Sequence, residues 1–463
     1  MKNLRKSSLT LLIALTLIVS IFVTSNGVVA MSLPLYGKHE SPNTFSKMTD
    51  EQLDGYFSFA EKAVETYYLT RMVSKKTTQA LDTLPTTSVV KKYLESKLVF
   101  ETSHAREFEY TENYISGEYS MLDWKIIDDS LYLKVFVMVA FKYSTSDEFS
   151  GFGRVVQIII ENPNDPIITD WYVDESYFDM NVRGYDLDLS KQENWLSNQA
   201  VSKIETRKVA CLNFLDESIA FTKQQEEKAK RGELDLGFEI EQPYKQAPNE
   251  EYIPTRLSST ARNNMRTYAK TNYNKAKPAS GGKGGNSSNV KYYDTYVNGC
   301  TEFISHCFLA GGFKTVGNND TALCWFQKNN SPPGNGTRSS SWAGVEALYQ
   351  FLKNKNRGSN DGGPRLNSNY SSNNTNVPYT SGDQDIIQIK YNFTGGYNYP
   401  NYGHSVIITG EQSLQTFVKR PKITWRTTST KFDINIYLDS RYPPAKNTTS
   451  GSGGHLYRMI ALQ

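Results

Sequence analysis

The chain has 463 residues, about three times the ~150 residues of a typical domain, which predicts two or three folded units. Its 38% hydrophobic and 21% charged residues exclude a collagen-like fibre, a polytopic membrane protein and a wholly disordered chain. The first thirty residues hold three of the 51 basic side chains and none of the 48 acidic ones, so the remainder carries 48 of each. This balance removes the electrostatic argument for a nucleic-acid partner or a polybasic membrane anchor.

The N-terminal segment has the three parts of a secretory signal. Basic residues from Lys2 to Lys6 precede an apolar run from Leu9 to Val23, and small residues end at Ala30. We therefore expect a signal peptide over 1–30 and a secreted or cell-surface protein. An uncleaved membrane anchor is the alternative, although the apolar run is shorter than the ~20 residues that a spanning helix needs.

The region 35–185 is expected to form a small α+β domain. Two stretches with helical periodicity come first, and three stretches with the two-residue alternation of strands follow: 49–73 and 88–98, then 130–143, 153–161 and 167–172. Thr49 and Gln52 are placed as in a capped helix start. Helices followed by an antiparallel meander are typical of the α+β class.

A long helix is predicted next, over 189–231, where apolar positions recur at helical spacing. Two helices broken near 212–216 are the alternative. The acidic segment 232–257 contains Pro243 and Pro248 and little periodicity, so we place the linker between domains there. The second domain then covers 258–463.

The segment 298–312 predicts a helix that begins at Cys300 and is stopped by Gly311 and Gly312. Cys307 falls on its apolar face and is expected in the core. A thiol in the first turn feels the positive end of the helix dipole, which favours the nucleophilic thiolate, so Cys300 is the candidate for chemistry. Seven residues of helix place the two thiols about 10.5 Å apart, too far for a disulfide, and no zinc-ligand spacing accompanies them. We expect no metal or cofactor.

A cysteine nucleophile needs a base, and His404 is the best placed of the five histidines. It begins an apolar strand over 403–410, whose first residues would lie at a sheet edge. His306 lies in the Cys300 helix but points away from Cys300. A surface histidine at a strand end is the alternative for His404.

Five blocks together resemble the putative amidase domain of bacterial exported proteins, a relative of the papain-like cell-wall hydrolases: 300–312, 341–352, 382–391, 403–410 and 456–458. The resemblance covers roughly 258–463. It implies a papain-like α+β fold with Cys300 as nucleophile and His404 as general base. The third, orienting residue of the family lies on the strand over 434–440, where Asp439 occupies its place; Asp433 is the other acid near that strand.

The sequence departs from the family pattern in three places. Gly299 stands where an acid usually precedes the nucleophile, Gly403 replaces a common aspartate, and a Gly-rich insertion occupies 281–289. Gly299, the insertion and the unsettled third residue motivate a second hypothesis, a non-catalytic exported protein that binds the cell wall or a partner.

The leading hypothesis is a secreted cysteine amidase or peptidase that cleaves an amide bond of peptidoglycan or a related peptide. Cys300 attacks the carbonyl and His404 transfers the proton. Trp342, Gly299 and Tyr402 are expected to line the substrate groove; for the two aromatic residues ordinary packing is the alternative.

Overall fold

The computed structural model describes most of the chain from residue 44 onward. The described residues are 44–73, 78–174, 176–183, 201–234, 236, 257–274, 299–319, 321–327, 338–354, 357, 361–367, 374–382, 384–392, 402–415, 418–428, 431–446 and 453–463. The predicted signal segment lies outside them. Ser41–Gln463 form one compact unit.

Two helices begin this unit, and local capping explains where each starts. Ahead of α2 (Asp50–Val73), the Thr49 backbone N–H donates to Gln52 Oε1 at 2.9 Å and the Gln52 N–H donates to Thr49 Oγ1 at 3.3 Å. This reciprocal capping box confirms the predicted start. Before α3 (Ser88–Glu107), the hydroxyl of Thr87 accepts from the backbone N–H of Val90. The helix continues nine residues beyond its predicted end.

An antiparallel meander follows the helices, as the alternation predicted. β2 (Ser130–Tyr143) has the predicted bounds and pairs with a long strand, β1 (Glu112–Ile127), on one side and with β3 (Phe149–Glu161) on the other. Asp128 and Asp129 both have positive φ, 49° and 59°, as a tight two-residue hairpin turn between twisted strands requires. β4 (Ile167–Val173) pairs with the far side of β3.

The remaining elements follow in chain order. They are α4 (Tyr177–Arg183), α5 (Val201–Lys230), α6 (Ser259–Asn272), α7 (Cys300–Ala310), α8 (Ser340–Ala343), α9 (Val345–Leu352), β5 (Asn374–Thr375), β6 (Ile386–Asn392), β7 (His404–Gln415), β8 (Val418–Thr428), β9 (Lys431–Tyr437), α10 (Leu438–Arg441) and β10 (Gly454–Ile460), with two short 3-10 turns, Phe45–Lys47 and Thr78–Thr83, near the start. The linking helix α5 is continuous through 212–216, so the alternative of a break there is wrong.

The described strands form one ten-stranded sheet, and each strand pair within it is antiparallel. Its order is β1-β2-β3-β9-β8-β7-β6-β10-β5, with β4 beside β3. The meander and the second half of the chain are therefore joined edge to edge, through the pairing of β3 with β9. The predicted α+β class is confirmed. The predicted boundary at 232–257 falls mostly outside the described residues and stays a prediction.

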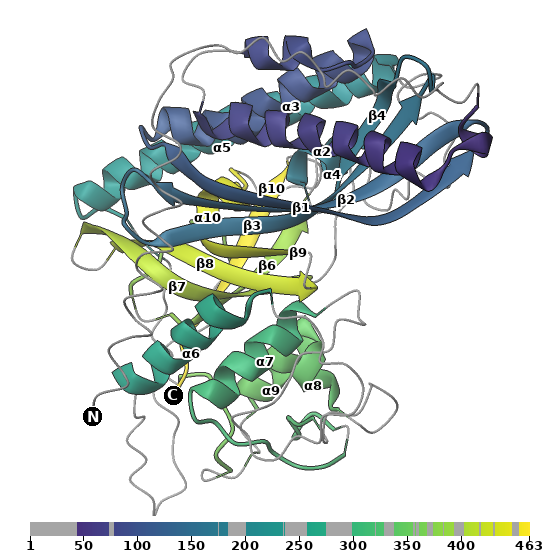
Figure 1. The fold of residues 1–463 in the computed structure, drawn as a ribbon. Helices are drawn as coiled ribbons and strands as arrows, with labels where there is room; N and C mark the ends of the chain where they lie inside the picture. The colour runs from purple at the N-terminus through teal and green to yellow at the C-terminus, as the bar shows by residue number, and fades with distance from the viewer. Residues whose placement is uncertain are drawn as a thin grey trace, which may run out of the picture. The chain divides into compact units, whose positions relative to one another are not determined.

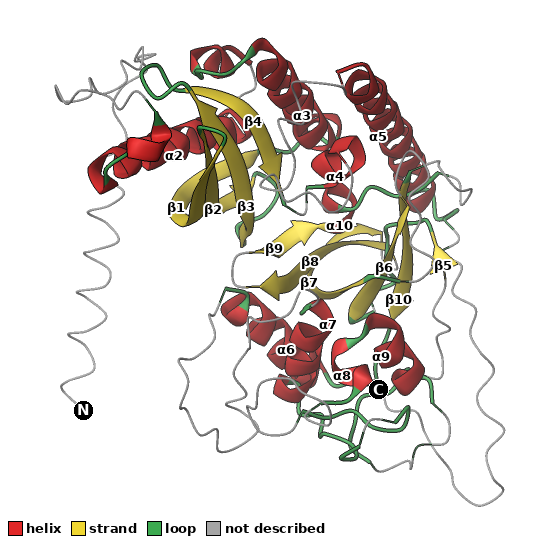
Figure 2. Cartoon of the chain, turned by 90° about the vertical axis from the view of Figure 1, so that its right-hand side faces the viewer, coloured by secondary structure: helices red, strands yellow, loops and turns green. Residues whose placement is uncertain are grey.

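The two faces of this sheet carry different helices, as Figures 1 and 2 show. Along β7, Val406 and Ile408 pack in one buried cluster with side chains of α2, α3, α4 and α5. Ile407, between them, packs in a second cluster with α6, α7, α8 and α9. The alternation arises because successive strand residues face opposite sides, and it means that α7 reaches the sheet from the face opposite the N-terminal helices.

The junction of β3 with β9 requires a glycine at position 153. A β-carbon there would lie 2.4 Å from the ring of Phe432, its pairing partner on β9. We predict that Gly153→Ala lowers the free energy of unfolding by about 1–3 kcal/mol through overpacking, measured by urea denaturation.

Phe432→Leu in the same chain provides the control. The smaller side chain opens space beside position 153. The free energy of unfolding should therefore fall less in the double variant than the sum of the decreases in Gly153→Ala and Phe432→Leu. A Gly153→Ala protein as stable as the unmodified chain would show that the junction tolerates a side chain here.

Candidate functional site

The predicted nucleophile lies at the start of α7. The helix begins at Cys300, and Gly299 is its N-cap residue, whose carbonyl accepts from the backbone N–H of Phe303 at 2.9 Å. Gly311 is the C-cap, so both predicted ends are confirmed. Cys300 exposes only 3% of its surface. Its place in the first turn puts the thiol at the positive end of the helix dipole.

The residues on either side of Cys300 contact β7, which carries the predicted base, and its neighbour β8. Thr301 Oγ1 and Ser405 Oγ are hydrogen-bonded at 3.2 Å, and Ser405 directly follows His404 on β7. A β-carbon on Gly299 would lie 2.4 Å from the carbonyl oxygen of Thr427 on β8. The pairing of β7 with β8 begins at Ile407 and Thr424, so Thr427 lies beyond that pair towards the end of the sheet from which β7 starts. The start of α7 therefore lies near the end of β7 that carries His404, on the face to which Ser405 and Ile407 belong. The His404 ring packs with Trp425 and Tyr442 on the opposite face, with Val406 and Ile408, so these contacts do not join it to Cys300.

The imidazole of His404 is enclosed by aromatic rings. It is 5% exposed, so the alternative of a surface histidine is wrong. The Trp425 ring meets it edge-on with 4.6 Å between ring centroids, and Tyr442 packs at 5.7 Å. Nε2 is buried and has no hydrogen-bond partner among the described residues. Burial, reinforced by the charge of Arg441, lowers the pKa of His404 to about 3, so the ring is neutral near pH 7.

The two acids considered as orienting residues have partners other than His404. Asp439 accepts from Arg420 Nε at 2.8 and 3.1 Å and lies 3.4 Å from His104 Nε2. Burial alone would raise the pKa of Asp439, but Arg420 and His104 hold it well below its ordinary value. Asp433 accepts from the indole N–H of Trp425 at 2.5 Å. Neither carboxylate therefore reaches the imidazole, and Trp425 separates it from Asp433.

Comparison with known proteins supports the resemblance over this part of the chain. Residues 259–444 match the model of a family described as a putative amidase domain. We call this segment the amidase domain after the family model that it matches. The match runs from the first residue of α6 to just beyond α10 and includes Cys300 and His404. Neither a curated protein nor a solved structure matches the chain.

Trp342 and Tyr402, both expected in a substrate groove, are buried and packed against other side chains. Trp342 is fully buried, with its ring 4.8 Å from that of Trp325 and 5.4 Å from that of His306, so it lies in the core beneath α7 rather than on an open surface. Tyr402 is 8% exposed and stacks against the guanidinium of Arg458 at 3.9 Å. Burial raises the pKa of Tyr402 to about 12.

Gly299, the third expected groove residue, is explained by close packing. Its φ of −74° is one that any residue adopts, so conformational freedom is not the reason for glycine here. The reason is the carbonyl of Thr427, which leaves no room for a side chain. An acid at this position, common in the family, would require β8 to lie further from α7.

The four cysteines are buried, and no disulfide joins them. Cys307 is fully buried in the cluster of α6–α9, which confirms its prediction as a core residue, and burial raises the pKa of its thiol well above the ordinary value. Within the described ranges, no group of three His, Cys, Asp or Glu side chains is arranged to hold a metal ion. No helix in this part of the chain has the length and hydrophobicity to cross a bilayer.

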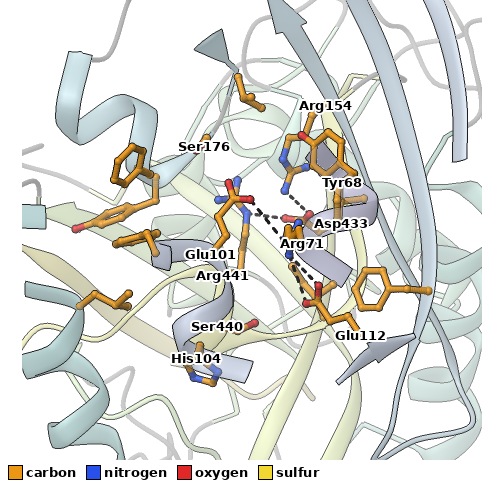
Figure 3. Close-up of a pocket in the computed structure, with 18 of the residues that line it drawn as sticks. Tyr68, Arg71, Glu101, His104, Glu112, Arg154, Ser176, Asp433, Ser440 and Arg441 are labelled. Carbon is orange, nitrogen blue, oxygen red and sulfur yellow. Dashed lines mark hydrogen bonds and ion pairs between the residues drawn. The ribbon is translucent and has the colours of Figure 1, made fainter. Parts of the chain in front are cut away.

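A charged cavity of about 80 Å³ lies at the junction between the N-terminal half and the amidase domain (Figure 3). Arg71 bonds Glu112 at 3.1 Å, and Asp433 bonds two arginines, Arg154 at 2.5 Å and Arg441 at 2.8 Å. These close pairs satisfy the buried charges; they tie α2 to β1, and they tie β3 and α10 to β9. Sequence reasoning missed this network because its members come from segments as far as 279 residues apart.

The buried histidines make stability depend on pH. Burial lowers the pKa of His306, His404 and His455 to about 3, so below pH ~6.5 the unfolded chain binds protons that the folded chain does not. Stability should therefore fall on acidification, by about 1.4 kcal/mol per pH unit for each histidine between pH ~6 and ~4. Urea unfolding at pH 7, 6 and 5 measures this slope.

His306→Phe keeps a ring beside Trp342 and removes one titrating group, so its slope should be smaller by about 1.4 kcal/mol per pH unit. Carboxylates that titrate in the same pH range contribute equally to both proteins, so subtracting one slope from the other removes their contribution. Equal slopes would mean that His306 is protonated in the folded chain.

The packing of Gly299 gives a second prediction for the site. Gly299→Ala should lower the free energy of unfolding by about 1–3 kcal/mol, because the methyl group would overlap Thr427. Gly403→Ala is the matched control: its β-carbon would meet the Tyr391 ring at 3.5 Å, an ordinary contact, so a change within about 0.5 kcal/mol is expected. Equal losses in the two variants would contradict the close approach of β8.

Proposed function

We propose that this protein is an exported cysteine-dependent amidase or peptidase, with Cys300 as nucleophile and His404 as general base. One observation carries the proposal: both chain neighbours of Cys300 contact the end of the sheet on which His404 lies. The amidase family match supports the reaction class, hydrolysis of an amide bond.

The proposed reaction has two steps. His404 takes the thiol proton as Cys300 Sγ attacks the amide carbonyl, and the backbone N–H groups at the start of α7 stabilise the oxyanion. His404 then gives the proton to the departing amine, which leaves an acyl-enzyme. Water, activated by the same imidazole, attacks the thioester and releases the acid together with the thiol.

Neutral His404 has a free nitrogen for the thiol proton, but a pKa of about 3 makes the ring a weak base, so the proposed step requires its pKa to rise when the site opens. Its enclosure by rings disfavours the imidazolium, and the ring packs on the face of β7 opposite α7. The proposal therefore requires the imidazole to turn towards Cys300 before the ion pair forms. In this proposal Trp425 positions His404 by edge-on contact, and Asp433 holds the indole by its hydrogen bond. Asp439 would have to leave Arg420 and His104 to act in the same way.

The proposed substrate is an amide bond of peptidoglycan or of a related peptide. The resemblance to exported cell-wall amidases and the predicted secretory signal at residues 1–30 are the support for it. Cys300 and His404 are both nearly buried, so a substrate reaches them only after the covering side chains move.

The same burial favours a second candidate, a non-catalytic exported binding protein on the amidase scaffold. It requires an inert thiol, since a buried cysteine stays protonated. Iodoacetamide near neutral pH discriminates the two: rapid labelling of Cys300, located by peptide mass spectrometry, supports the enzyme, and an unlabelled Cys300 in the folded protein supports the binding protein.

Digestion of peptidoglycan tests the activity directly. We expect the mature protein to release new amino groups without new sugar reducing ends, because an amide bond and not a glycosidic bond is cut. Cys300→Ala should lower the rate at least about a thousandfold and leave the fold intact, since no other group supplies the nucleophile.

Cys307→Ala is the matched control. It removes a thiol from the same helix, but one that lies about two turns further along, in the core, so it should retain activity at some cost in stability. Amine release that persists in Cys300→Ala would exclude the proposed nucleophile.

A further inference from the structure

A second, open site lies on the amidase domain away from Cys300. It is a groove of about 760 Å³ bounded by α6, by the distal part of β7 with β8, and by the turn between β2 and β3. This volume is within the ~300–1,000 Å³ typical of small-molecule sites. Thr409 lines it, five residues beyond His404 on β7 and so about 17 Å further along the strand.

Three cations line the groove, and two of them are weakly paired. Arg266 and Lys270 lie one turn apart on α6, and Lys422 projects from β8. Lys422 Nζ is 3.8 Å from Glu148 Oε2, and Arg266 Nη2 is 3.8 Å from Glu411 Oε2. Both distances exceed that of a hydrogen-bonded ion pair.

Lys422 and the Nε atom of Arg266 are buried to a degree that is unusual for charged groups. The Lys422 side chain is only 5% exposed. Arg266 Nε is buried without a hydrogen-bond partner in the described part of the chain. Burial lowers the pKa of both side chains, and the nearby carboxylates do not offset it. Buried charges normally have close partners, so an additional anion would stabilise this arrangement.

The charge balance of the groove limits what that anion can be. Glu148 and Glu411 are the carboxylates among its lining residues, which leaves one positive charge in excess. Glu148 is shared, because Lys270 bonds it at 3.0 Å. A ligand with one net negative charge would neutralise the site, whereas a cation would add to the excess.

The rest of the lining is suited to a polar ligand. It consists mainly of hydroxyl and amide groups, such as Thr145, Asn263 and Gln412, and Gln412 Oε1 is buried without a partner among the described residues. A shift in register between Ile408 and Gly410 bends β7 at this point, as β-bulges do beside binding sites.

We infer that this groove binds a small polar molecule through a carboxylate or phosphate group held by Lys422 and Arg266. The bound oxyanion would accept from the ammonium of Lys422 and from the guanidinium of Arg266. The hydroxyl and amide groups along the groove would contact the remainder of the molecule. This inference does not depend on Cys300 or on amide hydrolysis.

Isothermal titration calorimetry of the full chain with three probes tests it. Inorganic phosphate and glucuronate supply the two oxyanions, and glucose is the uncharged match for glucuronate. We expect saturable binding of at least one anion, none of glucose, and weakening as salt is raised. The anion that binds more tightly, phosphate or glucuronate, identifies the oxyanion that the groove prefers, and either result supports the site.

Two variants and a control assign the binding to the groove. Lys422→Met keeps the aliphatic stem beside Tyr437, and Arg266→Gln keeps a polar side chain on α6; each should lower the anion affinity at least about tenfold. Lys419→Met removes the same charge from the same strand, outside the groove, and should change the affinity less than about twofold. Urea unfolding of each variant separates loss of binding from loss of the fold.

The inference is overturned if neither anion binds, if glucose binds as well as glucuronate, or if the folded Lys422→Met protein retains full affinity. None of these results bears on amide hydrolysis, because the titration requires no catalysis.

Discussion

The pairing of β3 with β9 is the contact on which the rest of this structure depends. It joins the N-terminal meander to the sheet of the amidase domain, and Gly153 on β3 makes the close approach to Phe432 possible. Arg154 then bonds Asp433 across the pair, with both charges nearly buried. Burial of two charges is compensated only by close contact, so this ion pair favours one register of the junction over its neighbours.

The junction is linked to the candidate catalytic histidine by a short series of contacts. Asp433, held by Arg154 from the N-terminal half, accepts from the indole of Trp425, and the Trp425 ring packs against His404. The surroundings of His404 thus include a group anchored by the other half of the chain. The N-terminal half therefore helps to hold the Trp425 ring against the His404 imidazole.

The proposed chemistry and the observed burial are compatible if the site opens for its substrate. A nucleophile covered on all sides is protected from oxidation and from unwanted acylation, but it reacts only with a molecule that displaces its cover. The polar groove at the far end of β7 is open and lies apart from this site. This part of the chain therefore presents two unlike regions, a closed one around the buried Cys300 and an open groove rich in cations.

Local signals in the sequence determined several of the helices and strands. The Thr49 capping box, the alternation over 130–143 and the helix start at Cys300 follow from contacts within a few residues, and the structure confirms each of them. Only the tertiary structure decided what surrounds these elements. The enclosure of His404 and the single sheet arise from contacts between distant segments, for which local periodicity contains no information.

The partners of Asp439 are the clearest case. Its sequence position suggested a role beside His404, but Arg420 and His104, 19 and 335 residues away, bind its carboxylate instead. Trp425 had no chemical signature in its strand, yet it is the ring that contacts the imidazole. A buried charge binds whichever opposite charge the completed fold brings within reach, and that choice is made by packing between distant segments.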